Sequence, residues 1–131
     1  MITKEFVFTK TFTISEKVYS NFLETFQDHN PLHTNKEFAT SHGFEGIVMH
    51  GNILNGIISY FIGECLPMKN VIIHMQTIKF LNPVYLNDDV TLVAEVEDIY
   101  ESVNSIAFKF YFNNQSGKKV AKGTVQIGLL K

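Results

Sequence analysis

Residues 51–66 read GNILNGIISYFIGECL and form the most apolar stretch of the chain. The stretch is interrupted only by isolated polar residues such as Asn55 and Glu64. A transmembrane helix needs about 20 apolar residues, so this shorter stretch predicts a helix buried inside a domain. We expect the helix to begin near Gly51–Asn52 and to end near Cys65, two residues before a proline.

Alternating apolar residues on both sides of this helix predict β-strands. In the first strand Phe6, Phe8 and Phe12 fall on one side and threonines on the other. The expected strands cover residues 6–13, 71–80, 90–96, 106–112 and 121–129. Turn-forming sequences that separate the last four strands are too short for parallel crossovers. The strands are therefore expected to be antiparallel.

A second helix is expected after the first strand. Ser15 is a suitable N-cap, and Glu16 follows it in the positive first turn. The apolar face of this amphipathic helix is expected to include Val18, Phe22 and Phe26, with Tyr19 and Leu23 beside them. This order of elements predicts an α+β domain. It matches the hotdog arrangement, a curved antiparallel sheet around one apolar helix, but periodicity alone does not establish the curvature of the sheet. We expect residues 1–131 to form a single domain.

Composition excludes several classes of function. The formal net charge is −2, so the chain lacks the basic character of a nucleic-acid-binding domain or a membrane-surface protein. The single cysteine, Cys65, cannot form an intramolecular disulfide, which favours the reducing cytoplasm. Residues 1–5 carry no apolar segment of the kind found in signal peptides. We therefore expect a cytoplasmic protein.

The stretch between the two helices, residues 27–50, carries the residues suited to chemistry. It contains four of the five histidines and reads QDHNPLH at 27–33 and GFEGIVMHG at 43–51. Connections of this length are usually functional or disordered, and we expect an ordered but irregular functional loop.

Within this loop Asp28 and His33 lie five residues apart on either side of Asn30–Pro31. Proline fixes its own φ and restricts the residue before it, so the two side chains have a limited separation. A carboxylate and an imidazole held in this way can bind one water molecule between them. An isolated Asp or His on a loop is more often solvated or a helix cap. The catalytic interpretation therefore depends on the spacing of the two residues and on the whole motif.

Gly51 lies where the apolar helix is expected to begin. The first amide groups of a helix have no partner within it, and the helix dipole favours an anion there. Glycine also lets a carbonyl oxygen approach the backbone closely. The alternative is that Gly51 only forms a turn into the helix. His50 is expected to be a structural hydrogen-bond donor or to line the site.

The motif Asp-x-Asn-Pro-x-His-x5-Ala, followed by a His-Gly step into an apolar helix, resembles the MaoC-like dehydratases. This family is also called hydratase 2 or the (R)-specific enoyl-CoA hydratases. Residues 76–85, QTIKFLNPVY, resemble the family's Gln-x-x-x-Phe-x-x-Pro-Val segment. One position departs from the pattern, because Gln27 stands where many members have glycine.

The resemblance implies a hotdog homodimer that reversibly hydrates a trans-2-enoyl thioester of CoA or acyl-carrier protein to the (R)-3-hydroxyacyl thioester. It implies that Asp28 and His33 are the catalytic pair and that the Gly51 amide binds the developing oxyanion. We assign His33 as the water-activating base and Asp28 as its partner in water positioning and proton transfer. The sequence does not fix how the two residues divide these roles. It also suggests Ser59 as a residue that orients Asp28. The residues expected to contact substrate are Asn30, Pro31, His50 and Asn52.

No cofactor or metal is expected. His42 and His74 have no partner at metal-ligand spacing, and the chain has no Cys pair or His-Glu-x-x-His motif. His29 is expected to be exposed. Two other functions remain open, a hotdog acyl thioesterase and a non-catalytic protein that binds acyl thioesters or partners a dehydratase subunit.

Overall fold

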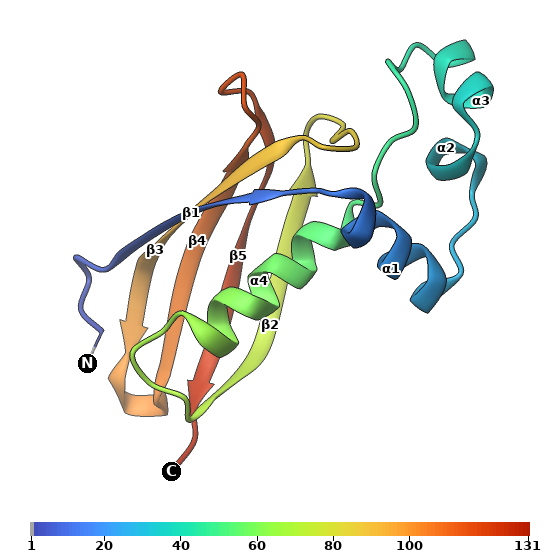
Figure 1. Cartoon of the computed structure of the whole chain (residues 1–131). Helices are drawn as coiled ribbons and strands as arrows, with labels where there is room; N and C mark the ends of the chain where they lie inside the picture. Colours follow the sequence, from blue (N-terminus) through green and yellow to red (C-terminus); the bar gives the residue numbers. More distant parts are fainter. Residues whose placement is uncertain (1) are drawn as a thin grey trace.

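The computed structural model describes residues 2–131, in which one antiparallel sheet carries helices between its first two strands in sequence (Figure 1). The strands are β1 (Val7–Thr13), β2 (Val71–Phe80), β3 (Asp89–Tyr100), β4 (Ser105–Asn113) and β5 (Lys119–Leu129). The helices are α1 (Glu16–Phe26), α2 (Pro31–Thr34), α3 (Lys36–Ser41) and α4 (Asn52–Glu64), with a 3-10 turn, η1, at Glu101–Val103.

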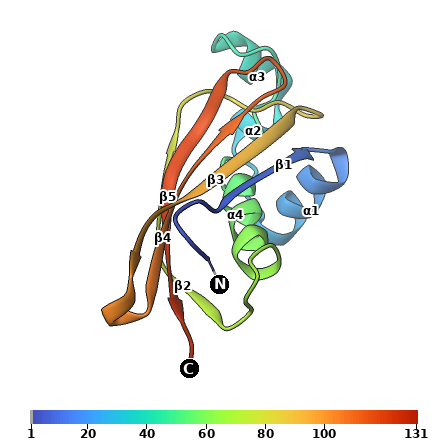
Figure 2. The same ribbon diagram turned by 90° about the vertical axis from the view of Figure 1, so that its left-hand side faces the viewer.

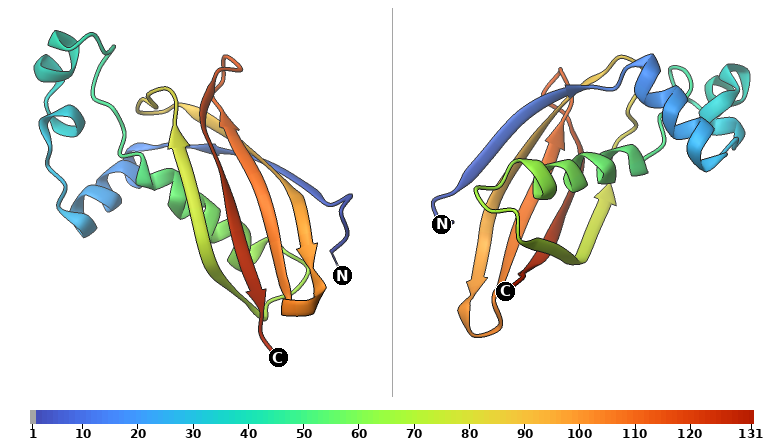
Figure 3. Two further views of the ribbon diagram at one scale, coloured as in Figure 1. Left: turned by 180° about the vertical axis from the view of Figure 1, so that it is seen from behind. Right: turned by 60° about the horizontal axis from the view of Figure 1, so that its bottom comes forward.

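The five strands are ordered β1-β3-β4-β5-β2, and every neighbouring pair is antiparallel. The sheet curves around α4, which crosses one of its faces (Figure 2). Seen from behind, the opposite face carries no helix from residues 2–131 (Figure 3). The predicted strands and their antiparallel pairing are confirmed.

The core lies between α4 and the sheet. Ile58 and Phe61 on α4 are fully buried, and the Phe61 ring meets the fully buried Phe108 of β4 edge-on with centroids 5.4 Å apart. The ring of Phe8 in β1 also packs on Phe61, with centroids 5.0 Å apart. Burying each of these large side chains removes about 150–250 Å² of surface from water, so this aromatic cluster holds α4 against the sheet.

The predicted bounds of α4 are confirmed, because Gly51 is its N-cap and Cys65 its C-cap. The helix is not buried all round, however. Gly56, Ser59, Tyr60 and Gly63 form an exposed face. Small residues at this spacing bring little apolar area to a contact, and the sheet packs on the opposite, bulkier face of the helix.

The predicted N-cap of α1 is confirmed, since the Ser15 hydroxyl accepts a hydrogen bond from the Val18 amide at 3.3 Å. The expected apolar face is only partly correct. Tyr19 is the buried residue of α1, whereas Phe26 is 66 % exposed. Phe26 is the last residue of the helix, and its ring packs on Phe22 with centroids 4.8 Å apart rather than entering the core.

Residues 27–50 are more regular than the expected loop, because they contain α2 and α3. Asn30 caps α2 by accepting from the Leu32 amide at 2.9 Å, and Pro31 occupies the first helical position. Asn35 caps α3 in the same way through the Phe38 amide at 3.0 Å. Side-chain caps therefore start both helices, and both lie beyond one end of the sheet (Figure 1).

Candidate active site

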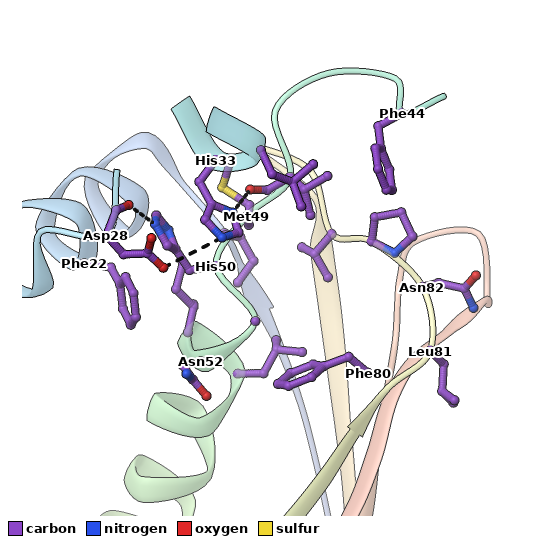
Figure 4. Close-up of a pocket in the computed structure, with 18 residues that line it drawn as sticks. Phe22, Asp28, His33, Phe44, Met49, His50, Asn52, Phe80, Leu81 and Asn82 are labelled. Carbon is purple, nitrogen blue, oxygen red and sulfur yellow. Dashed lines mark hydrogen bonds and ion pairs between the residues drawn. The ribbon is translucent and has the colours of Figure 1, made fainter. Parts of the chain in front are cut away.

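Residues from three parts of the chain meet in one pocket of about 490 Å³ (Figure 4). Asp28 follows α1, His33 lies on α2, and His50 and Gly51 lead into α4. The segment 80–84, which follows β2, forms the opposite wall. The structure thus brings the predicted catalytic pair and the predicted oxyanion donor to the same cavity.

The Asp28 carboxylate and the His33 imidazole face each other across a short gap. The distance from His33 Nε2 to Asp28 Oδ2 is 3.9 Å. This is too long for a direct hydrogen bond, and it leaves both atoms able to contact one water molecule beside them. The His33 side chain is 16 % exposed and that of Asp28 51 %, so the gap is reached from the pocket.

A backbone carbonyl fixes the tautomer of His33. Its Nδ1 lies 2.7 Å from the carbonyl oxygen of Val48, and a carbonyl can only accept a hydrogen bond. The proton of neutral His33 is therefore on Nδ1, and the Nε2 lone pair faces Asp28. His33 is thus presented to the pocket as a proton acceptor.

Tyr19 holds the backbone of the same residue. Its hydroxyl donates to the His33 carbonyl oxygen at 2.6 Å. Burial, followed by the nearby Glu16 carboxylate, raises the pKa of the Tyr19 phenol above its ordinary value. The phenol therefore keeps its proton and its hydrogen bond at neutral pH, and α1 is tied to α2.

His50 is buried at the centre of the site, with 3 % of its surface exposed. Its Nε2 donates to the backbone carbonyl of Asp28 at 2.9 Å. The ring packs against that of His33 with centroids 4.1 Å apart, and against Phe22 at 4.8 Å. His50 therefore joins the start of α4 to both members of the Asp28–His33 pair, and it also lines the pocket.

Asp28, His33 and His50 each offer one potential metal-ligand atom, all within 4.8 Å of one another. The spacing of the Asp28–His33 motif does not predict this trio, because His50 lies outside the motif. Nε2 of His50 is already bonded to a carbonyl, and its Nδ1 is shielded from solvent with no partner among residues 2–131. The geometry therefore suits a water between Asp28 and His33 better than an ion shared by all three.

The amide of Gly51 is available at the N-terminus of α4. Neither Gly51 nor Asn52 donates its amide hydrogen to an acceptor within residues 2–131. The ring of Phe80 covers Gly51 so closely that an added Cβ would lie 2.8 Å from Phe80 Cε1. A side chain at position 51 would therefore displace the Phe80 ring, and Gly51 and Asn52 lie in the wall of the pocket.

Three of the sequence-based expectations need correction. Asn30 and Pro31 do not line the pocket, because their side chains start α2, where Asn30 Oδ1 accepts from Leu32. They shape the site through the backbone instead of by contact. Ser59 is exposed on α4 and makes no side-chain hydrogen bond with residues 2–131, so it does not reach Asp28. Asn52 does line the pocket.

Sequence reasoning missed a polar chain that orients Asn52. The Gln76 amide donates to Asn55 Oδ1, and the Asn55 amide donates to Asn52 Oδ1 at 2.7 Å. Because Oδ1 of Asn52 already accepts this hydrogen bond, the side-chain NH₂ group of Asn52 is left to donate to other acceptors. The three residues lie on α4 and β2, and the spacing of Asn52 and Asn55 along one helix face was the available signal.

Comparison with known proteins agrees with this fold. Residues 1–116 match the family model of the MaoC like domain, and the chain belongs to this family. It is 30 % identical to an (R)-specific enoyl-CoA hydratase of Rhodospirillum rubrum over 115 residues, which are 88 % of this chain and 79 % of that protein. The family resemblance drawn from the motifs is therefore confirmed.

A second relative is an (R)-specific enoyl-CoA hydratase of Aeromonas caviae, 37 % identical over 75 residues. The match covers 57 % of this chain and just over half, 56 %, of that protein. The solved structure of the (R)-hydratase from A. caviae involved in PHA biosynthesis superimposes with a TM-score of 0.89 at 26 % identity, covering 98 % of this chain and 97 % of that one. The expected hotdog fold is confirmed.

Within residues 2–131 the structure has no helix that is both long and apolar enough to span a membrane.

Proposed function

We propose that this chain is a hydro-lyase that reversibly adds water to a trans-2-enoyl thioester and forms the (R)-3-hydroxyacyl thioester. The observation that carries the proposal is the pair Asp28 and His33, with 3.9 Å between them, in the same pocket as the free amide of Gly51. The family and the hydratases named above support it.

In the proposed mechanism one water molecule contacts both Asp28 and His33. His33 Nε2 takes a proton from the water as its oxygen attacks the β-carbon, and Asp28 orients the water through a hydrogen bond. A proton held by this pair is then delivered to the α-carbon. The net change is the addition of one hydrogen and one hydroxyl group. Positioned proton transfer of this kind contributes about 10²–10⁴-fold to rate.

Attack on the β-carbon pushes negative charge onto the thioester oxygen. We place that oxygen against the Gly51 amide, where the positive end of the α4 dipole adds to the hydrogen bond. The acyl chain would leave the pocket past Asp28 and Asn52, which also line an apolar groove of about 1040 Å³ between α1 and α4. Phe22, Ile57 and Tyr60 line that groove.

The first test mixes the purified protein with crotonyl-CoA. We expect absorbance of the conjugated enoyl thioester to fall while no free thiol appears. Release of thiol would identify a thioesterase, and an unchanged spectrum in the presence of bound ligand would identify a non-catalytic binding protein. Either of these results would overturn the proposal.

A second prediction concerns His50 as a positioning residue. In His50→Gln the side-chain amide can take the place of Nε2–H and still donate to the Asp28 carbonyl. In His50→Asn the amide is too short to reach it. Both variants lose the ring equally, so we expect kcat to fall about tenfold further in His50→Asn than in His50→Gln, since small misplacement of reacting groups is costly. Equal rates in the two folded variants would contradict this role.

We also propose that residues 1–131 act as a single domain that pairs into a homodimer. The edge strand β2 exposes Ile72, Met75 and Phe80, each by roughly half, and such an edge favours pairing with a second copy. Light scattering at micromolar concentration should give about twice the 14.9 kDa mass of one chain. A mass equal to that of one chain would contradict the dimer.

The carrier of the acyl group is expected to be CoA or acyl-carrier protein. The one cysteine, Cys65, is partly buried and has no second cysteine in the chain to pair with, which supports a cytoplasmic location.

A further inference from the structure

Four lysines gather in a hollow on the sheet face that α4 does not cover. Lys79 of β2, Lys109 of β4, and Lys119 and Lys122 of β5 line this hollow, which has a volume of about 590 Å³. Figure 3 shows this face of β2, β5 and β4 from behind. In a chain whose net charge is −2, this is a local concentration of positive charge.

Most of that charge has no partner. Glu95 is the carboxylate among the residues lining the hollow, and it pairs with Lys109 at 3.1 Å. Within residues 2–131, Lys79, Lys119 and Lys122 form no ion pair with a carboxylate. Lys79 and Lys122 even stand directly opposite each other on adjacent strands, an arrangement that destabilises a sheet. An anion bound between them would relieve this repulsion.

The uncharged groups in the hollow also suit a phosphorylated ligand. The hydroxyls of Thr77 and Thr124 lie 2.8 Å apart on neighbouring strands, and hydroxyls bind phosphate oxygens. The Nζ atom of Lys119 lies 4.6 Å from the centre of the Tyr111 ring, which gives the hollow an aromatic surface. Because the hollow is concave and is lined by lysine charges and hydroxyl groups, it suits a small polyanionic ligand better than the broad surface of another protein.

The hollow and the candidate active site are lined by consecutive residues at the end of β2. Lys79 immediately precedes Phe80, which lines the pocket. Beyond it, the Leu81 amide donates to the Val120 carbonyl at 2.9 Å, and the Asn82 side chain donates to the Lys119 carbonyl at 2.7 Å. Leu81 and Asn82 lie on the side of the pocket opposite Asp28 (Figure 4). Residues 80–82 therefore lie between the pocket and the lysines.

We propose that the lysine hollow binds the phosphate groups of a CoA thioester, and that the pantetheine arm crosses the wall at Leu81 and Asn82. This inference rests on the proposed hydration of an enoyl thioester. It assigns the carrier as CoA, whose diphosphate and 3′-phosphate lie at the far end of the arm from the reacting carbons. The acyl chain would then extend the other way, past Asp28 into the groove between α1 and α4.

The test compares Lys79→Ala/Lys122→Ala with wild type on three substrates. Crotonyl-CoA carries the phosphates, crotonyl-pantetheine lacks them, and crotonyl-acyl-carrier protein replaces the nucleotide with a protein. We expect KM for crotonyl-CoA to rise about tenfold with kcat unchanged, because charged contacts to phosphate are lost. Kinetics with crotonyl-pantetheine should not change. A matched control, Lys17→Ala/Lys131→Ala, removes the same charge from exposed sites elsewhere.

Equal effects on the CoA and pantetheine substrates, or no effect on either, would overturn the proposal. A loss confined to the carrier-protein substrate would instead show that the hollow docks that protein, which also overturns it. Binding of free CoA, measured by calorimetry, separates this inference from the proposed function. A wild-type protein that hydrates none of the substrates contradicts the function, whereas the hollow is tested by whether the double variant binds free CoA about tenfold more weakly.

Discussion

Replacing His33 with alanine is expected to lower kcat for crotonyl-CoA hydration by at least about 10²-fold. The Nε2 lone pair faces the Asp28 carboxylate because Nδ1 is bonded to the Val48 carbonyl, so alanine removes the proposed proton acceptor. Asp28→Asn should cause a loss of similar size, since an amide of the same shape cannot carry the proton. Steady-state kinetics over a range of crotonyl-CoA concentrations provides the measurement.

The two substitutions are expected to affect the stability of the fold differently, so the unfolding temperature of each variant serves as a control. Asp28 is half exposed, and its variant should unfold at the wild-type temperature. His33 packs against His50, so its alanine variant loses a ring contact as well. His29→Ala is the matched control, because His29 is exposed in the same loop and should leave kcat unchanged. Near wild-type turnover in either catalytic variant would refute the assignment of the pair.

Much of this site could be predicted because its key residues are close in sequence. Asp28, His33 and the Asn30–Pro31 step lie within six residues, so their separation is limited by local backbone geometry. The strands could be predicted for a similar reason, since alternation along β4 reports directly which side chains enter the core. Both the motif spacing and the alternation of apolar residues can be recognised without knowing what the segment packs against.

Features that depend on distant partners were not predictable in this way. His50 bonds to the carbonyl of Asp28, 22 residues earlier, and only the packing of α1 against the start of α4 brings them together. Ser59 lies in the apolar stretch that predicted a buried helix, and it was expected to orient Asp28. It is exposed because the sheet packs on the other side of α4, and the run of Gly56, Ser59 and Gly63 was the available signal.

Local signals were also missed where side chains cap very short helices. Asn30 and Asn35 start helices of four and six residues, which have too few turns to show periodicity. Gln27, where many family members have glycine, adopts a left-handed conformation with φ 59° at the end of α1. The family's glycine therefore reflects a backbone requirement, which this chain meets at a cost of about 1 kcal/mol.

Replacing Gly51 tests the oxyanion site separately from the acid–base pair. In Gly51→Val a branched side chain would stand where the thioester oxygen approaches the free amide, and we expect kcat and kcat/KM to fall together by about 10²–10³-fold. A fall in both parameters indicates an interaction made in the transition state. If the side chain merely hindered substrate entry, KM would rise while kcat held.

The structure shows that this experiment needs a second variant, because a Cβ at Gly51 would press on the ring of Phe80. Phe80→Ala removes that ring, and Phe80 is half exposed, so the single variant should stay folded. In the Phe80→Ala background, Gly51→Val meets no ring but still blocks the amide, and the loss in kcat should persist. If removing the ring restores activity, the defect of Gly51→Val came from displacing Phe80. The amide at the start of α4 would then be only part of the architecture, and the group that polarises the thioester would lie elsewhere in the pocket.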